Sequence, residues 1–302
     1  MSKHLRIWLF ALLGTLLAST TLLAQGVITM TTSKAVGETV KLRIEANGNV
    51  TIEGVKELPQ LGKDKKNYTL TSQTITIHGD VTKLDCSDNQ LTSLDLPKST
   101  VLTWLWCSGN QLTSLDLSNN TALTTLGCSN NQLTSLDLPK NTALTTLYCD
   151  RNQLTRLDVS KNAALTELGC SENQLTSLDV SKNTALTTLF CFENKLTSLD
   201  VSKNIALTEL YCSNNQLTSL NVSRCARLNT LYCDSNRING KAMNKLVNSL
   251  PNRRRKSSGA ILLVDNSPEK RDKNRCSPAD VTTARRKNWE VLKLESSKIR
   301  AF

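Results

Sequence analysis

Histidine is almost absent from this sequence of 302 residues, since only His4 and His78 occur. His4 lies in the extreme amino-terminal segment, which leaves His78 as the one imidazole in the body of the chain. Ser-His-Asp and Cys-His catalytic sets need an imidazole as their general base, and no phosphate-binding loop or metal-ligand cluster takes their place. The sequence therefore predicts a protein that is not an enzyme and that uses no cofactor and no metal.

Long hydrophobic runs are also missing beyond residue 24. Lys3 and Arg6 precede an apolar run from Ile7 to Ala18, and small and polar residues lead from there to Ala24. This order is typical of a secretory signal peptide, here residues 1–24. The apolar run is too short to cross a membrane as a helix, so we expect an exported protein with no transmembrane segment.

Positive charge is scarce over most of the chain, although the formal net charge is +11. From Lys241 to the end there are 16 basic and 6 acidic residues, whereas residues 27–240 carry a net charge of about −1. Nucleic-acid binding needs basic residues along the binding surface itself, so the sequence predicts no nucleic-acid partner. The basic run "NRRRK" at 252–256 is either an exposed loop or a site for a polyanion such as an anionic glycan.

The ten cysteines follow a regular order. Disulfide frameworks pair irregularly spaced positions, and a straight row of thiols cannot converge on one metal ion, so we expect a ladder of small buried side chains. Only Cys225 and Cys276 fall outside the series, and a disulfide between them is a hypothesis that rests on this fact alone. Eight cysteines are spaced 21 residues apart, namely Cys86, Cys107, Cys128, Cys149, Cys170, Cys191, Cys212 and Cys233.

Aligned on these cysteines, residues 81–238 repeat the pattern L-x-x-L-x-C-x-x-N-x-L-T-S-L-D-[LV]-[SP]-K-N-x-A in seven full units and a partial eighth. The pattern resembles a leucine-rich repeat, in particular the 21-residue, cysteine-ladder class of internalin-J-like surface or secreted proteins of bacteria. The resemblance implies a location at the surface or in the outer envelope of a bacterium, or outside the cell. It also implies an adhesion role, with a host or bacterial surface protein as the partner.

One unit cannot fold alone, because ordering its 21 residues costs more free energy than burying its few apolar side chains contributes. The units must therefore stack, with "TLYC" as a short parallel strand and "LTSLDL" as a second extended segment on the opposite side. We expect a right-handed, mostly β leucine-rich repeat solenoid. Its turns should be closed by the amides of Asn89, Asn110, Asn131, Asn152, Asn173, Asn194, Asn215 and Asn236.

Both ends of such a stack need covers. Residues 25–80 predict a β cap, in which residues 40–55, "VKLRIEANGNVTIEGV", have the pattern of a hairpin with a turn at Asn47 and Gly48. Residues 239–302 predict a basic α/β cap, with a strand at 259–265, a helix with Ser277 as its N-cap, and a final strand. An earlier helix, ending at Pro251, is expected from the helical spacing of Met243, Leu246, Val247 and Leu250.

Aromatic residues number only 12, and seven of them are predicted to lie on one face of the sheet. The residue before each cysteine must point outward, because it is one step from an inward position. Gly127 and Gly169 interrupt this outward column, which favours a recognition surface over aromatic side chains that only brace the sheet. We predict contact residues Trp104, Trp106, Tyr148, Phe190, Phe192, Tyr211 and Tyr232, with the acidic neighbours Glu167, Glu209, Asp150 and Asp234.

A second outward column is acidic, and a nearly complete row of basic residues follows it three positions later. A calcium ladder would need a glycine-rich nonapeptide that is missing, so we expect charge compensation in solvent. The acidic column is Asp95, Asp116, Asp137, Asp158, Asp179 and Asp200, and the second row is Lys98, Asn119, Lys140, Lys161, Lys182, Lys203 and Arg224.

The sequence therefore predicts a non-enzymatic, secreted or cell-surface protein that uses the concave face of its repeats for protein–protein interaction. Rigidity of the stack would keep the entropic cost of association low. A glycan-binding module and a structural component of an envelope or biofilm matrix are the two alternatives. The sequence does not determine the oligomeric state.

Overall fold

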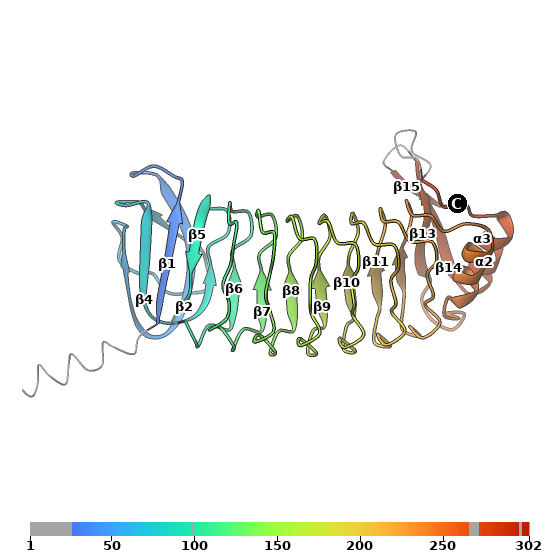
Figure 1. The fold of residues 1–302 in the computed structure, drawn as a ribbon, viewed down its shortest axis with the longest axis horizontal. Helices are drawn as coiled ribbons and strands as arrows, with labels where there is room; N and C mark the ends of the chain where they lie inside the picture. The colour runs from blue at the N-terminus through green and yellow to red at the C-terminus, as the bar shows by residue number, and fades with distance from the viewer. Residues whose placement is uncertain (1–25, 98, 266–271, 296–297, 302) are drawn as a thin grey trace, which may run out of the picture.

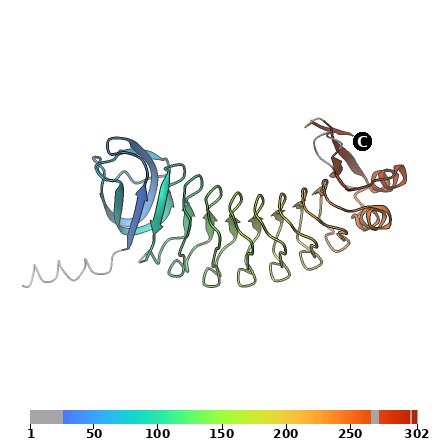
Figure 2. The same cartoon turned by 45° about the horizontal axis from the view of Figure 1, so that its top comes forward.

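The computed structural model describes residues 26–97, 99–265, 272–295 and 298–301 of the chain (Figure 1). The predicted signal peptide and Lys98 lie outside the described residues. The described part is a stack of narrow coils between two terminal caps, and the coils follow a shallow arc (Figure 2). Strands from the coils and from both caps form one 15-stranded sheet. The predicted mostly β solenoid is confirmed.

Each coil contributes one short strand to this sheet. The strands pair in parallel with every residue opposite the residue 21 positions later, as in Leu147 opposite Leu168. Because the register step equals the repeat period, identical side chains stack in columns, and the central leucines are fully buried. The strands are β6 (Trp104–Trp106), β7 (Thr125–Gly127), β8 (Thr146–Tyr148), β9 (Glu167–Gly169), β10 (Thr188–Phe190), β11 (Glu209–Tyr211) and β12 (Thr230–Tyr232).

The second extended segment of the repeat forms a strand only in the first coil. There β5 (Leu91–Asp95) pairs with β1 of the amino-terminal cap. In the later coils the segment is irregular, and its leucines still point into the core, as Leu154 and Leu157 do. The coil therefore closes by side-chain packing on this side.

The amino-terminal cap is a set of antiparallel strands: β1 (Val27–Thr32), β2 (Thr39–Glu53), β3 (Lys66–Thr69) and β4 (Thr74–Asp85). β4 runs on from the cap into the first coil, where it pairs in parallel with β6. The predicted hairpin over residues 40–55 is wrong. β2 pairs with β4 up to Asn47 and again from Thr51, so the chain does not turn back on itself at this point. Gly48 lies in the bulge between them with φ of +88°. A glycine with positive φ suits a turn or a bulge equally, and the long partner strand selects the bulge.

The carboxyl-terminal cap has the predicted α/β order: α2 (Gly240–Ser249), β13 (Gly259–Asp265), α3 (Pro278–Arg286), β14 (Trp289–Glu295) and β15 (Lys298–Ala301). The prediction that Ser277 caps the second helix is confirmed. Asp280 N–H donates to Ser277 Oγ at 3.2 Å, and Ser277 N–H donates to Asp280 Oδ2 at 2.9 Å, which is a capping box. β13 continues the repeat register, with Leu262 opposite Tyr232.

The predicted asparagine ladder closes one turn of every coil. Asn152 shows its bonding: Nδ2 donates to the carbonyls of Cys128 (3.0 Å) and Cys149 (3.1 Å), and Oδ1 accepts from Leu133 N–H at 3.0 Å. Both caps extend the ladder. At one end Lys41 N–H donates to Asn89 Oδ1 at 2.8 Å, and at the other Asn274 takes the next position.

Asn274 belongs to no repeat, yet it reproduces the bonding of the ladder asparagines. Its Nδ2 donates to Cys233 O at 2.9 Å, and its Oδ1 accepts from Ile238 N–H at 2.7 Å. The carboxyl-terminal cap therefore satisfies the last exposed backbone groups with the same side chain that the coils use.

A second column of buried asparagines follows the lysine row and was not predicted. Each of its Nδ2 groups donates to the backbone of the preceding coil, as Asn162 does to Leu138 O (3.1 Å) and Asn141 O (2.8 Å). The Oδ1 atoms of this column are buried and accept no hydrogen bond. The column consists of Asn120, Asn141, Asn162, Asn183 and Asn204.

Cys225 occupies the position that follows Asn204 in this second column, 21 residues later. It is fully buried, and its Sγ lies 3.6 Å from Val201 O, against the same backbone that the asparagines bond. Cys225 and Cys276 are both free thiols, so the structure contradicts the hypothesis of a disulfide between them. Cys225 falls outside the first series because it belongs to another column.

Candidate functional site

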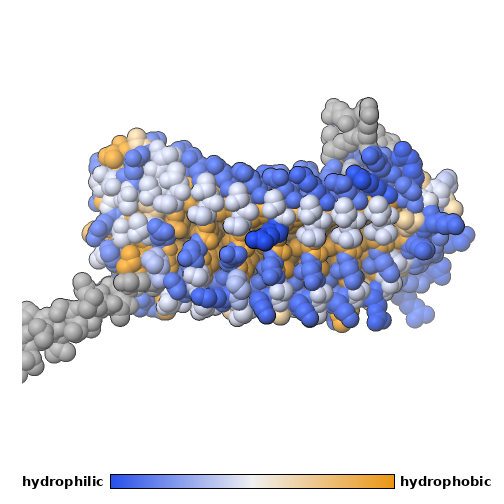
Figure 3. Space-filling model, in the orientation of Figure 1, coloured by the Kyte–Doolittle hydropathy of each residue, from blue (hydrophilic) through white to orange (hydrophobic). Residues whose placement is uncertain are grey.

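The surface of the coils carries little apolar area. The face in Figure 3 shows only a narrow apolar band along the stack, bordered by polar rows. Large exposed hydrophobic side chains are scattered over the described residues, and they are Val36, Leu58, Leu61, Val101, Ile205 and Ile299. A broad apolar patch is therefore not the candidate binding site. The clustered aromatic residues are the stronger candidate for a binding site.

We use the name strand face for the surface formed by the outward side chains of β4 and β6–β12. It includes the side chain of the residue directly after each ladder cysteine. All seven predicted aromatic residues are half-buried, and six of them meet in two clusters on this face. The amino-proximal cluster contains Trp104, Trp106 and Tyr148. The carboxyl-proximal cluster contains Phe190, Tyr211 and Tyr232. No ring contact with another aromatic residue is found for Phe192 among the described residues.

In the amino-proximal cluster, the rings of Trp104 and Trp106 stack with centroids 5.7 Å apart, and Tyr148 lies 6.0 Å from Trp106. Trp106 and Tyr148 are two coils apart, so their rings meet across Gly127. The guanidinium of Arg43, from the amino-terminal cap, lies 4.9 Å from the centre of Trp104. Arg43 also forms an ion pair with Glu45. This cluster is therefore already in contact with a cation of the same chain.

The two glycines do not interrupt the aromatic column as the sequence suggested. A Cβ atom at Gly127 would lie 2.8 Å from the Trp106 ring, and one at Gly169 would lie 2.7 Å from the Tyr148 ring. Each glycine therefore accommodates the ring of the preceding coil, which lies flat across the sheet. The glycines therefore do not favour recognition over bracing, because these rings pack on the sheet as well as face solvent.

In the carboxyl-proximal cluster, Phe190 and Tyr211 stack with centroids 4.8 Å apart and an interplanar angle of 19°. Tyr232 meets Tyr211 edge-on at 5.1 Å. These three residues occupy consecutive coils, opposite one another in the parallel register. Together they form a platform three coils long.

The predicted acidic neighbours hold the tyrosine hydroxyls. Tyr148 donates to Glu167 Oε2 at 2.5 Å, and Tyr211 donates to Glu209 Oε2 at 3.1 Å. Burial and the adjacent carboxylates raise the pKa of both tyrosines to about 12. The hydroxyls therefore stay protonated at neutral pH and keep each glutamate beside a ring.

Asp150 and Asp234 follow their ladder cysteines directly and are more enclosed than the glutamates. Ser129 Oγ donates to Asp150 at 3.2 Å, and Ser213 Oγ donates to Asp234. Burial raises the pKa of both carboxyl groups. They add negative potential to the strand face and offer little surface for direct contact.

The opposite side of the coils carries the acidic column, and its carboxylates form turns. In four coils the serine N–H two residues later donates to the aspartate Oδ1 at 2.8–2.9 Å, as Ser181 does to Asp179. Asn221 makes the same bond with Ser223 in a later coil. This backbone bond is the main cause that lowers the pKa of these carboxyl groups, and the lysines contribute less. The expected charge compensation is therefore secondary to a turn.

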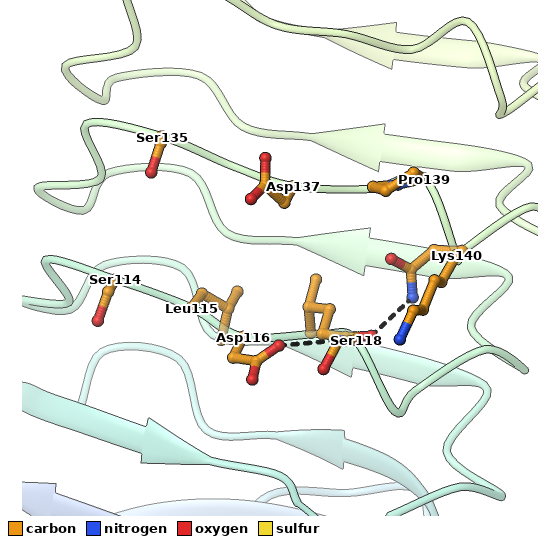
Figure 4. Close-up of a pocket in the computed structure, with 10 residues that line it drawn as sticks. Ser114, Leu115, Asp116, Ser118, Ser135, Asp137, Pro139 and Lys140 are labelled. Atoms are coloured by element: carbon orange, nitrogen blue, oxygen red, sulfur yellow. Dashed lines mark hydrogen bonds between the residues drawn. The ribbon is translucent and has the colours of Figure 1, made fainter.

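A shallow hollow of about 360 Å³ lies between two coils on this side (Figure 4). Its lining includes Ser114, Asp116, Ser135, Asp137 and Lys140. The same residue types recur in neighbouring coils, so the hollow is a feature of the repeat. It contains no imidazole and no thiol.

The basic run at 252–256 is partly structural. Arg253 is 5% exposed, its guanidinium lies 5.9 Å from the centre of the Trp289 ring, and its Nη1 donates to Leu228 O at 3.0 Å. Arg254 Nε donates to Arg286 O at 2.7 Å. Arg253 therefore connects the cap to the last coil, whereas the Arg254 bond lies within the cap, and Arg254, Arg255 and Lys256 are exposed cations of the run.

Comparison with known proteins agrees with this geometry. A family model described as leucine-rich repeats in two copies matches residues 100–140 and 121–162. The matched residues lie within the coils that stack at a step of 21. These coils are leucine-rich repeats, and they form a leucine-rich repeat solenoid. Eight cysteines, one per coil, are fully buried, which confirms the predicted cysteine ladder.

Solved structures of repeat proteins are similar to it. The functional domain of InlJ from Listeria monocytogenes, which includes a cysteine ladder, is 29% identical over 76% of this chain and 57% of that chain, with a TM-score of 0.39. A leucine-rich repeat protein of Leptospira interrogans is 24% identical over 64% and 49%, with a TM-score of 0.53. Internalin C2 from Listeria monocytogenes is 22% identical over 52% and 73%, with a TM-score of 0.50. The chain thus spans about half the length of the first two. None of the curated proteins matches it.

The thiols of this leucine-rich repeat protein are poor nucleophiles. Burial raises the pKa of Cys86, Cys128 and Cys191 to about 12, and that of the other ladder cysteines well above its ordinary value. Within the described ranges, no group of three or more histidine, cysteine or acidic side chains is placed to hold a metal ion. The same ranges contain no helix long and apolar enough to span a bilayer.

Two features of the repeat surface escaped the sequence prediction. Arg43 reaches the strand face from a cap strand, and nothing in its local sequence indicates this. The role of the glycines did leave a signal: Gly127 follows Trp106 by 21 residues, and Gly169 follows Tyr148 by the same interval. An aromatic residue one period before a glycine could have indicated a ring lying across the next coil.

Proposed function

We propose that this leucine-rich repeat protein is an exported, non-enzymatic adhesion protein of a bacterium, secreted or at the cell surface, and that its strand face binds a partner protein. Leucine-rich repeat domains generally mediate protein interactions. The observation that carries the proposal is the concentration of six of the 12 aromatic residues in two clusters on one rigid sheet face. Clustered, half-exposed aromatic side chains are typical of protein-binding hot spots.

Export is supported by the amino-terminal pattern of charge and apolar residues over residues 1–24. Surface adhesion is supported by the likeness to internalins, whose structures share the fold. The strand face is a sheet supported by a continuous core, so little conformational entropy is lost when a partner binds.

The test adds bulk to the strand face without removing its packing. Thr188 is a half-exposed strand-face residue next to Phe190, so Thr188→Arg should obstruct the surface. Ser198→Arg, on the opposite side of the same coil, is the matched control, because Arg156 naturally occupies that repeat position. Both variants should have wild-type circular dichroism and melting temperature.

In a cross-linking pull-down from host and bacterial extracts, wild type and Ser198→Arg should recover the same protein, and Thr188→Arg should recover at least tenfold less. Equal recovery by all three would refute the proposed surface. Binding to a carbohydrate array that only Thr188→Arg abolishes would instead indicate a glycan ligand. Concentration-dependent self-association that only Thr188→Arg abolishes would indicate a matrix component.

A further inference from the structure

The two aromatic clusters differ in their contacts with cations. Trp104 in the amino-proximal cluster is covered by Arg43, whose charge is balanced by Glu45. Neither of the two cation–ring contacts found among the described residues involves Phe190, Tyr211 or Tyr232. The carboxyl-proximal cluster therefore has the rings and the carboxylate of such a site without the cation.

We propose that the carboxyl-proximal half of the strand face, from β8 to β12, binds an arginine-bearing, cationic segment of the partner protein. This inference rests on the proposed function, because it specifies what the strand face recognises. The proposed partner is a different protein and not a second copy of this chain.

Charge complementarity is the first support. The strand-face positions of these five coils, together with the turn residue two positions after each cysteine, carry six acidic side chains and one basic side chain. The basic one, Arg151, is already paired with Glu172 at 2.8 Å. A surface of this sign attracts cationic segments and repels anionic ones. The acidic residues are Asp150, Glu167, Glu172, Glu193, Glu209 and Asp234.

The arrangement around Glu209 is the second support. Its Oε2 accepts the Tyr211 hydroxyl, which holds the carboxylate at the edge of the Phe190–Tyr211 stack. A guanidinium can lie on an aromatic face and bond a carboxylate in its own plane, whereas an ammonium makes a point contact. Arg43 makes this double contact with Trp104 and Glu45 in the same molecule. The geometry therefore favours arginine over lysine.

Spacing suggests the form of the segment. Glu167 and Glu209 occupy one column two coils apart, which is about 9.6 Å at the usual strand spacing. In a polyproline II segment, side chains three residues apart lie on one side at about 9.3 Å. A segment with arginine at every third position would thus present successive guanidinium groups to successive acidic coils.

The test uses fluorescence anisotropy with a labelled peptide of nine residues in which three arginines alternate with pairs of prolines. Wild-type protein should bind it, and Glu167→Gln combined with Glu209→Gln should weaken binding about tenfold. Asp179→Asn combined with Asp200→Asn is the matched control. It removes the same charge from the opposite side, and Asn221 shows that asparagine keeps the turn bond. The control should bind within twofold of wild type.

Peptides with lysine or glutamate in place of arginine complete the design. The lysine peptide should bind about fivefold more weakly than the arginine peptide, and the glutamate peptide should not bind. Equal affinity for the arginine and glutamate peptides, or equal losses in the two double variants, would overturn the inference. Self-association of the wild type that the Glu167 and Glu209 substitutions abolish would also overturn it, because the basic carboxyl-terminal cap of a second copy would then be the occupant.

Failure here is distinguishable from failure of the proposed function. If a partner protein is lost with Thr188→Arg but retained by the double glutamine variant, the strand face still binds protein, and only the assignment to a cationic segment is wrong. If no partner depends on Thr188→Arg, the proposed function itself fails.

Discussion

Replacing Asn152 by alanine should destabilise the protein much more than replacing Asn162 by alanine, although both residues are buried asparagines of the same coil. Asn152 belongs to the ladder that closes the turn after the strand. Asn162 belongs to the second column, on the opposite side. Asn152 Nδ2 donates to three backbone carbonyls and Asn162 Nδ2 to two, and the two substitutions remove the same number of atoms.

The difference lies in the groups left behind. Without Asn152 Oδ1, the buried N–H of Leu133 loses its acceptor, since this bond of 3.0 Å is the one found for that N–H. An orphaned buried N–H costs about 1–3 kcal/mol. Without Asn162, Asn141 O still accepts from Leu144 N–H and Leu138 O still accepts from Asn141 N–H. The substitution also removes an Oδ1 that has no donor. We therefore expect Asn152→Ala to cost about 1–3 kcal/mol more than Asn162→Ala.

Guanidinium unfolding followed by circular dichroism would measure the two losses, with equal m-values as the condition for comparing them. Hydrogen exchange at the Leu133 amide gives a local reading, and it should accelerate only in Asn152→Ala. The reasoning is refuted if the two variants are equally stable, or if Leu133 exchanges at the same rate in both. Asn162→Cys offers a further control, because Cys225 occupies the equivalent position in the last full unit.

Four further outcomes follow from the same structure. Gly127→Ala should displace the Trp106 ring, whose nearest atom would lie 2.8 Å from the new Cβ, and the tryptophan emission should shift to the red. Glu193→Gly should raise the melting temperature, because the left-handed φ of +54° costs a non-glycine residue about 1–2 kcal/mol. Native protein should expose at most one reactive thiol to a thiol reagent, the half-buried Cys276, whereas all ten should react after denaturation. Burial raises the pKa of Asp150, so its native form binds protons more tightly than the unfolded form and stability is lost as the pH rises above about 3.9. Asp150→Asn should therefore raise the melting temperature at neutral pH and have no stabilising effect below about pH 3.

Much of the scaffold could be predicted from the sequence, because the residues that each coil needs for folding recur at the same positions in successive units. The inward leucines, the cysteine ladder and the asparagine ladder were all predictable, since a side chain that recurs at the repeat period must occupy the same environment in every coil. The helix caps followed from local chemistry, as with Ser277 and Pro278. The second column of asparagines keeps the same period over five coils, and it could have been recognised from the asparagine that follows the lysine row.

Sequence alone determined the period, the inward and outward faces, and therefore which aromatic and acidic residues share the strand face. Tertiary structure decided what those residues contact. Gly48 lies in a bulge because β4 extends past it, and Arg43 covers Trp104 because β2 of the cap lies beside the first coil. The Trp106 and Tyr148 rings cross to the next coil because a glycine is there to receive them. A periodic pattern specifies positions along one coil, whereas contacts between a cap and a coil, or between rings two coils apart, depend on how separate segments meet in space.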